Sequence, residues 1–433
     1  MKPISFCIAT AKNEREYVKL LIQSIKEHTQ ISLHEILVFI DSDNQDTYAA
    51  LMHIKETELP NLRVFRNESA FPVGGQRNIS IMFNEAVNEV VCYLQSDMVV
   101  GKDFDKFISH NVDENTVVAC ARIEPPLHPP GPEKIVKDFG LTPEDFDYSS
   151  FNQFVDELQQ ENRPNTNGHF APFAVYKSTW IDRLGGFDTQ FRCSREDSDT
   201  IIRMELCGLN MIQSWNACVY HFTCVSSRGD GWFKKNEDAD YKNALQTQAD
   251  LQELKRFIRK WGYFGHHPKP VYDVTFKIEM DHYADFNLLK MIEPYCTQMV
   301  LSDSKVAYQL ASQLEFEAHY FSNLRWNYTQ DHWNKVQYLF NPTDFYKRIN
   351  SNQEEVGDII VSFKFSQLIS NWNIPDTQGL FQNIHEVVNQ SEIGVYEAGP
   401  FIIDIRAKND LGSKYAKHRD IDLLLNEQKF EFI

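Results

Sequence analysis

The chain has 433 residues, which predicts roughly two to three domains, and its 42% hydrophobic and 24% charged residues exclude collagen-like, coiled-coil and wholly disordered chains. Its 61 acidic and 43 basic residues give a net charge of −18, which disfavours nucleic acid or an anionic lipid surface as the main partner. No window approaches 18 consecutive apolar residues, so no membrane span is predicted.

The first 125 residues alternate strand and helix patterns. Short apolar runs predict five strands at Ile4–Thr10, Glu35–Ile40, Leu62–Phe65, Val90–Leu94 and Thr116–Ile123. Helical spacing of apolar residues follows Asn13, the expected helix cap, and begins again at Gly74-Gly75. This alternation predicts βαβ units and a mostly parallel sheet, in which ligands bind beyond the carboxyl ends of the strands.

The pattern changes at three later points. Residues 124–168 are Pro-rich and then acidic and helical, which predicts an insert. After it we expect one strand at Phe173–Tyr176 and another that ends at Phe222. The Gly- and Ser-containing segment 223–236 has the composition of a mobile loop. Beyond Pro268-Lys269-Pro270 a new strand pattern predicts a second, α/β or α+β domain, so we expect domains at 1–267 and 268–433.

The eight cysteines contain no C-x-x-C pair. Cys7, Cys92 and Cys120 lie within apolar runs, so we expect buried, reduced thiols and a cytoplasmic location. Signatures of other enzyme classes are missing from the sequence, because it has no P-loop, no G-x-G-x-x-G after the first strand and no G-x-S-x-G. That disfavours kinases, dehydrogenases and hydrolases.

Six different polar motifs follow one another along the first half of the chain. They are Ala9-Thr10-Ala11-Lys12-Asn13-Glu14, Ile40-Asp41-Ser42-Asp43, Gly75-Gln76-Arg77-Asn78, Gln95-Ser96-Asp97, Gly185-Gly186-Phe187-Asp188 and Arg195-Glu196-Asp197. Over residues 1–225 this order resembles family 2 glycosyltransferases of the GT-A fold. The sequence of these motifs also resembles that of glycosyltransferases of large marine phages, which would place the protein in a host cytoplasm.

The resemblance implies a metal site at Gln95-Ser96-Asp97, where the family carries D-x-D. A divalent cation, Mn²⁺ or Mg²⁺, would offset the charge of the donor phosphates and of the leaving nucleoside diphosphate. Gln95 replaces the first acid, which leaves Asp97 as the expected ligand. His221 follows an apolar strand and is either a further metal ligand, for which imidazole favours Mn²⁺, or a core histidine.

The pair Glu196-Asp197 resembles the acceptor-side acids of inverting members of the family. Inverting transfer needs one base to take the proton of the acceptor hydroxyl, and the resemblance assigns this role to Asp197, with Glu196 positioning the acceptor. The same acids would also suit a helix N-terminus, where they complement the helix dipole.

The remaining donor contacts follow from the resemblance. Residues expected to bind the nucleotide or its phosphates are Thr10, Asn13, Glu14, Asp41, Asp43, Arg77, Asn78, Ser96 and Arg228. Arg77 would meet the diphosphate or orient Asp97, and Arg228, in the segment 223–236, would close over the donor or be a solvated basic residue.

The expected function is therefore metal-dependent, inverting transfer of a sugar from a nucleotide-diphosphate sugar, with a UDP-sugar favoured, to a hydroxyl of a glycan or another acceptor. Gln95 keeps open a non-catalytic nucleotide-sugar or glycan-binding module. Glycosylation of modified DNA bases is a further alternative, against which the net charge argues. A nucleotidyltransferase would need a Gly-rich basic loop after the first strand, and Thr10–Glu14 is not one.

Overall fold

The computed structural model describes residues 1–10, 14–41, 45–67, 75–128, 130–131, 133–168, 172–188, 191, 194–223, 225, 251–265, 267–324, 345–352 and 356–416. Contacts divide them into two compact units, unit 1 within Met1–Asp238 and unit 2 within Ala239–Ala416. Residues 251–261 are helical and fall in unit 2, whereas the sequence pattern placed the boundary at 267. Among the described residues no helix is long and apolar enough to cross a membrane.

Unit 1 is built on a ten-stranded mixed sheet. Its strands are β1 (Ile4–Thr10), β2 (Glu35–Ile40), β3 (Leu62–Arg66), β4 (Val90–Gln95), β5 (Met98–Val100), β6 (Thr116–Glu124), β7 (Lys134–Val136), β8 (Thr166–Asn167), β9 (Phe173–Tyr176) and β10 (Asn210–His221). Its helices are α1 (Arg15–His28), α2 (Gln45–Thr57), α3 (Gly75–Glu85), α4 (Phe104–Ser109), α5 (Tyr148–Glu161) and α6 (Glu196–Leu206), with the short η1 (Ile31–Leu33) and the π-helix η2 (Thr179–Leu184).

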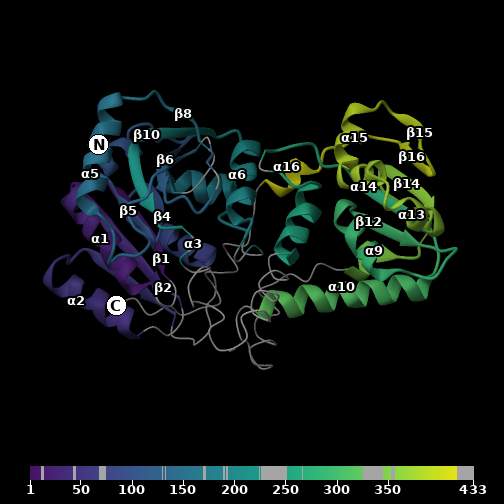
Figure 1. Ribbon diagram of the computed structural model, residues 1–433, viewed down its shortest axis with the longest axis horizontal. Coiled ribbons are helices and arrows are strands. Elements are labelled where there is room, and N and C mark those ends of the chain that lie inside the picture. Colours follow the sequence, from purple (N-terminus) through teal and green to yellow (C-terminus); the bar gives the residue numbers. More distant parts are fainter. Residues whose placement is uncertain are drawn as a thin grey trace. The chain divides into compact units, whose positions relative to one another are not determined.

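The strand order is β3-β2-β1-β4-β9-β6-β10-β5, with β7 beside β6 and β8 beside β10 (Figure 1). β3, β2, β1 and β4 are parallel, β9 runs antiparallel between β4 and β6, and β10 is parallel to β6. The predicted strand bounds at β1, β2 and β9 are confirmed residue for residue. The predicted fold class is confirmed as well.

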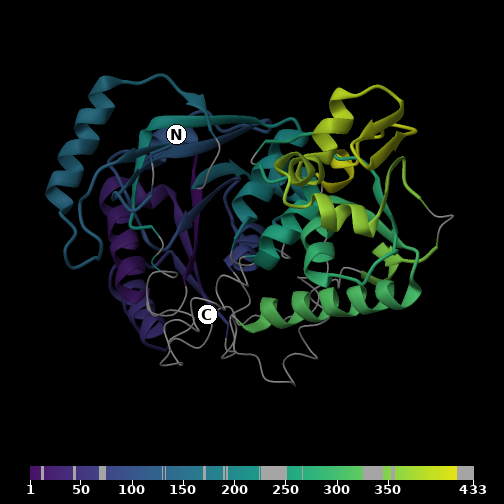
Figure 2. The same ribbon diagram turned by 45° about the vertical axis from the view of Figure 1, so that its right-hand side comes forward.

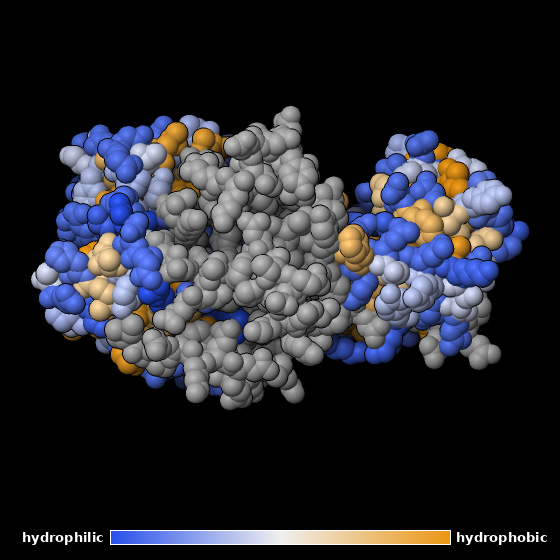
Figure 3. Space-filling view, turned by 90° about the horizontal axis from the view of Figure 1, so that it is seen from below, coloured by the Kyte–Doolittle hydropathy of each residue, from blue (hydrophilic) through white to orange (hydrophobic). Residues whose placement is uncertain are grey.

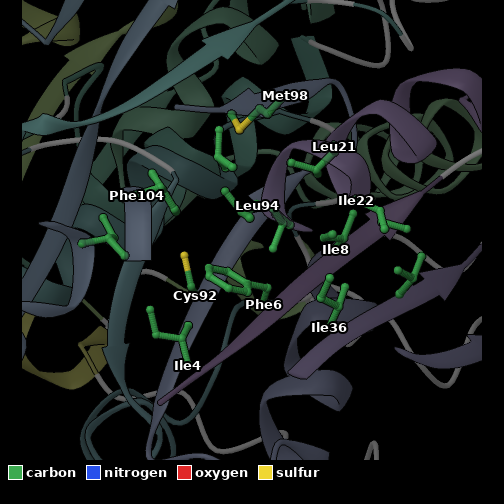
Figure 4. Close-up of a cluster of buried hydrophobic side chains, with 14 of the residues drawn as sticks. Ile4, Phe6, Ile8, Leu21, Ile22, Ile36, Cys92, Leu94, Met98 and Phe104 are labelled. Atoms are coloured by element: carbon green, nitrogen blue, oxygen red, sulfur yellow. The ribbon is translucent and has the colours of Figure 1, made fainter. Parts of the chain in front are cut away.

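The core of unit 1 explains why these strands lie at its centre. β1 and β2 are continuous apolar runs whose residues are nearly all buried, as expected of parallel strands covered on both faces. In Figure 4, Ile4, Phe6 and Ile8 of β1 lie among Ile36, Leu94 and residues of α1. A rigid core thus fixes the strand ends from which the polar motifs project.

Unit 2 has its own core and a six-stranded sheet of order β13-β12-β11-β14-β16-β15. The strands are β11 (Val274–Glu279), β12 (Gln298–Leu301), β13 (Ile349–Asn350), β14 (Ile359–Lys364), β15 (Gly394–Ala398) and β16 (Phe401–Ile405). The helices are α9 (Phe286–Ile292), η3 (Glu293–Tyr295), α10 (Ser304–Leu324), α12 (Phe345–Arg348), α13 (Phe365–Asn371), α14 (Pro375–Gln382), α15 (Ile384–Gln390) and α16 (Gly412–Tyr415), and Figure 2 shows them from a second direction.

The first four strands of unit 2 are parallel, and β16 is antiparallel to both neighbours. The second domain is therefore an α/β unit, as expected. Buried Glu293 ties helix 251–261 into this unit, because Arg259 donates to both of its oxygens at 2.7–3.1 Å and Arg348 donates to Oε1 at 2.6 Å. In Figure 3 the described surface is mostly hydrophilic, with hydrophobic side chains in small groups.

The six described cysteines, Cys7, Cys92, Cys120, Cys207, Cys218 and Cys296, are free thiols. Burial raises the pKa of Cys92 above its usual value and that of Cys218 to about 12. They are packing residues, in line with the expectation of reduced, buried thiols.

Candidate active site

The ends of β1 and β2 bring two of the expected donor residues together. Thr10 and Asp41 are 1% and 4% exposed, and the Asp41 backbone N–H donates to the Thr10 carbonyl oxygen at 2.9 Å. Asn67, at the end of β3, donates from Nδ2 to the Asp41 carboxylate at 3.2 Å. Asn13 and Asp43, the other residues expected here, lie outside the described residues.

Glu14 and Ser96 link the start of α1 to the turn after β4. The Ser96 hydroxyl donates to Glu14 Oε2 at 2.6 Å, and both side chains are buried. α1 begins at Arg15, the Glu14 side chain makes no capping hydrogen bond to it, and Glu16 pairs with Lys19 at 2.8 Å. Glu14 therefore stands at the N-cap position of α1, but its carboxylate is held by Ser96 at the carboxyl edge of the sheet and does not cap the helix.

Asp97 and His221 meet although 123 residues separate them in the sequence. β5 pairs antiparallel with the end of β10, so that Met98 is opposite His221 and Asp97 lies beside it. Asp97 Oδ1 is 3.5 Å from His221 Nε2. On the other side of the ring, His221 Nδ1 is 2.8 Å from Oε1 of Glu124, the last residue of β6.

Charges on both sides of His221 shift the pKa values of this chain of residues. Burial alone would lower the pKa of His221, but the carboxylates of Asp97 and Glu124 raise it to about 9. Burial acts to raise the pKa of Glu124, yet His221, Arg122 and Lys134 together lower it to about 2. The pKa of Asp97 is also lowered, because His221 outweighs the effect of burial. Asp97 and Glu124 are thus carboxylates near neutral pH.

Gly185 and Gly186 anchor the start of the segment that leads to α6. Their φ angles are 71° and 88°, in the left-handed region that favours glycine, which explains the doubled glycine in the sequence. Arg203 of α6, fully buried, donates from Nη2 to the carbonyls of Leu184 at 2.5 Å and Gly186 at 2.6 Å. This clamp fixes α6 against the glycine turn.

Glu196 and Asp197 form the first turn of α6, both half-buried, after Arg195, whose φ of 68° is unusual for a residue other than glycine. Burial raises the pKa of Asp197, and the charges of Arg122 and His221 offset part of that rise. A carboxylate with a raised pKa is a stronger proton acceptor, as a general base requires.

Tyr93, a residue that the sequence patterns did not single out, lies near these acids. Its ring packs edge-on against Phe173 and Phe187 at centroid distances of 5.8 and 6.0 Å. Burial raises the pKa of Tyr93, and the charges of Asp197 and Glu196 raise it further. The available signal was its position two residues before Gln95 on β4, because residues two apart on a strand lie on the same face.

Arg77 and Asn78 lie in the first turns of α3, and both are buried. Asn78 is 0% exposed, yet among the described residues neither Oδ1 nor Nδ2 has a hydrogen-bond partner. Gln95 Oε1 is also buried and has no hydrogen-bond partner in the part of the chain that the structure describes. Because buried polar atoms are nearly always paired, these orphan atoms indicate a place for a bound ligand or water.

Two expectations cannot be placed. Arg228 lies outside the described residues, as does nearly all of the segment 223–236.

The insert 124–168 is described in large part: it forms β7, which pairs parallel with the end of β6, and the amphipathic helix α5. The insert therefore extends the sheet beside Glu124.

Asp97 and His221 are the two residues predicted to hold a metal ion. Among the described residues, no group of three or more His, Cys, Asp or Glu is arranged to hold a metal ion. The two residues nonetheless fit such an ion, because an oxygen and an imidazole nitrogen face each other and both are ligands of Mn²⁺. The remaining ligands would come from donor phosphates and water.

Residues 6–185 match the family described as glycosyl transferase family 2. Among solved structures the chain is similar to GalNAc-T7 with UDP, GalNAc and Mn²⁺ (TM-score 0.40, 14% identity, 58% of this chain and 51% of that chain). It is also similar to S. aureus TarS 1–349 (TM-score 0.40, 12% identity, 78% and 91%) and to TarS 1–349 with UDP (TM-score 0.37, 15% identity, 60% and 82%).

The chain thus spans about half the length of the GalNAc-T7 chain that it matches. No curated protein matches the sequence. The match over residues 6–185 covers β1 to η2, including the turns that carry Thr10, Asp41 and Asp97. This part of the chain is similar to family 2 glycosyltransferases.

Proposed function

We propose that unit 1 transfers a sugar from a nucleotide-diphosphate sugar, with a UDP-sugar favoured, to an acceptor hydroxyl with inversion at the anomeric carbon. The observation that carries this proposal is the pairing of Asp97 with His221 at the carboxyl edge of the sheet, where Asp97 belongs to the segment 6–185 that matches family 2 glycosyltransferases. Asn78, whose buried amide has no partner among the residues that the structure describes, supports a ligand at the same edge. Asp41 and Glu14 would face the nucleoside.

Asp97 and His221 would hold a divalent cation, Mn²⁺ or Mg²⁺. Such an ion, when bound, neutralises charge on the diphosphate as it leaves. Arg77 would contact the same phosphates from α3. Asp97 is kept ionised by the charge of His221, which suits it to a cation.

Asp197 would act as the general base and Glu196 would orient the acceptor. As the acceptor oxygen forms its bond to the anomeric carbon, Asp197 takes the hydroxyl proton, and the bond from that carbon to the diphosphate oxygen breaks with its electron pair on the leaving group. Burial of Asp197 raises its pKa and so increases its power to take the proton. Arg203 keeps both acids in place through the Gly186 carbonyl.

The test is a screen of nucleotide sugars in the presence of Mn²⁺, with two readouts. A donor at 100 times its dissociation constant should stabilise the protein by about 2.7 kcal/mol. The same donor should release its nucleoside diphosphate. Stabilisation without release, with a range of acceptors present, would favour the non-catalytic binding module that Gln95 leaves open.

A further inference from the structure

We propose that Glu124 is a positioning residue of the metal site, which fixes His221 so that Nε2 is directed at Asp97. The inference rests on the proposed function only for the metal ion at Asp97 and His221. Glu124 does not touch that ion; it acts through the imidazole ring.

The geometry around His221 is asymmetric. Glu124 Oε1 is 2.8 Å from Nδ1, a hydrogen-bond distance, whereas Asp97 Oδ1 is 3.5 Å from Nε2. Glu124 and His221 are 2% and 8% exposed, so water competes little for this bond. Metal-binding histidines commonly donate their second ring N–H to a carboxylate, which leaves the other nitrogen free for the metal. Here that arrangement leaves Nε2, the nitrogen that faces Asp97.

Glu124 is itself held from two sides. Lys134 Nζ is 3.0 Å from Oε2, and Arg122 Nη1 is 3.4 Å from Oε1. Lys134 belongs to β7, which pairs with the end of β6, so the insert supplies this contact. With cations beside both oxygens, Glu124 is an anion that only accepts hydrogen bonds and therefore fixes the proton of His221 on Nδ1.

A second buried histidine in unit 1 shows what a purely structural pair looks like. His34 Nε2 is 2.8 Å from Asp105, and its Nδ1 accepts the backbone N–H of Ile4 at 3.0 Å. Both nitrogens of His34 are therefore satisfied within the protein. At His221 the second nitrogen faces the Asp97 carboxylate at 3.5 Å, longer than a normal hydrogen bond, so a divalent cation that displaces the Nε2 proton would bind both groups.

The experiment measures Mn²⁺ binding to the full chain from the free-Mn²⁺ EPR signal, with and without UDP as the nucleotide probe. Glu124→Ala should raise the Mn²⁺ dissociation constant by about 10–100-fold, the usual effect of removing such a partner. Glu124→Gln should have a smaller effect, because its amide oxygen can still accept from Nδ1. The matched control is Asp105→Asn, which alters the equally short pair at His34 and should leave Mn²⁺ binding unchanged.

A double-mutant cycle separates positioning from a general structural role. In a His221→Ala background, Glu124→Ala should cause no further loss of Mn²⁺ affinity, because the group through which it acts is gone. A further loss of similar size would overturn the inference. If Glu124→Ala does not fold, the nearly isosteric Glu124→Gln decides, and wild-type affinity in that variant overturns the inference.

The same data distinguish failure of the inference from failure of the proposed function. If His221→Ala weakens Mn²⁺ binding and the Glu124 variants do not, only the positioning role is wrong. If Asp97→Asn and His221→Ala also bind Mn²⁺ like the wild type, or if the wild type binds none, both the metal assignment and the inference are wrong.

Discussion

The clamp between Arg203 and the glycine turn can be tested by Arg203→Met. The guanidinium donates to the carbonyls of Leu184 and Gly186 and lies 3.5 Å from Asp199 on the same helix. Methionine retains much of the aliphatic volume but leaves both carbonyls without this donor. The first turn of α6, with Glu196 and Asp197, should then lose its fixed position.

The size of the effect follows from the two hydrogen bonds. Hydrogen bonds to a charged group contribute about 1.5–3 kcal/mol each, so losing both should cost about 3–6 kcal/mol. A unit of this size loses about 2–4 °C of melting temperature per kcal/mol, which gives a decrease of roughly 6–24 °C. Turnover should fall as well, because the acids on α6 move.

The assay is thermal unfolding followed by calorimetry, with Arg163→Met as the matched control. Arg163 is exposed, and its ion pair with Glu161 has both side chains at least 42% exposed. Exposed pairs contribute at most about 1 kcal/mol, so the control should melt within about 4 °C of the wild type. If Arg203→Met melted together with the control, the clamp would contribute little and the reasoning would be wrong.

Three further outcomes are expected. Donor hydrolysis should vanish with chelator and return with Mn²⁺ or Mg²⁺ in the wild type but not in Asp97→Asn, and activity in chelator would contradict the metal role. Asp197→Asn should lower turnover by about 10²–10⁴-fold with donor affinity unchanged; a collapse of donor affinity would instead place Asp197 in the donor site. A fragment of residues 1–238, which is unit 1, should bind donor but transfer poorly, because the expected donor contacts lie within it and unit 2 is expected to shape the acceptor side; a folded fragment without donor binding would contradict this division.

The strand ends were predictable because buried parallel strands leave an unmistakable pattern. β1 and β2 are apolar runs bounded by polar residues, and their observed ends at Thr10 and Ile40 are the predicted ones. Once the strands are parallel, their carboxyl ends meet at one edge, which brings Thr10 and Asp41 together.

The role of Glu124 was not predictable from the same pattern. The expected strand ended one residue earlier, at Ile123, and the prolines that follow hid β7, which is only three residues long. A strand of that length has no measurable periodicity, and Lys134 therefore looked like any lysine of an insert. The signal that was present is an acid directly after the apolar run that ends at Ile123, whereas Asp97 was identified through the resemblance of Gln95-Ser96-Asp97 to the D-x-D motif.

The position of His221 depends on an irregularity that no sequence period reveals. Ser214 of β10 is opposite Cys120 of β6, but Cys218 is opposite Ala121, so residues 215–217 lie in a bulge of β10. Because the side-chain period of a strand is two, this odd shift changes the face on which every later residue of β10 lies. It also sets the register Tyr220 to Ile123, which brings His221 level with Glu124. Without the bulge His221 would lie beyond the end of β6, so the bulge is what joins the histidine to both carboxylates.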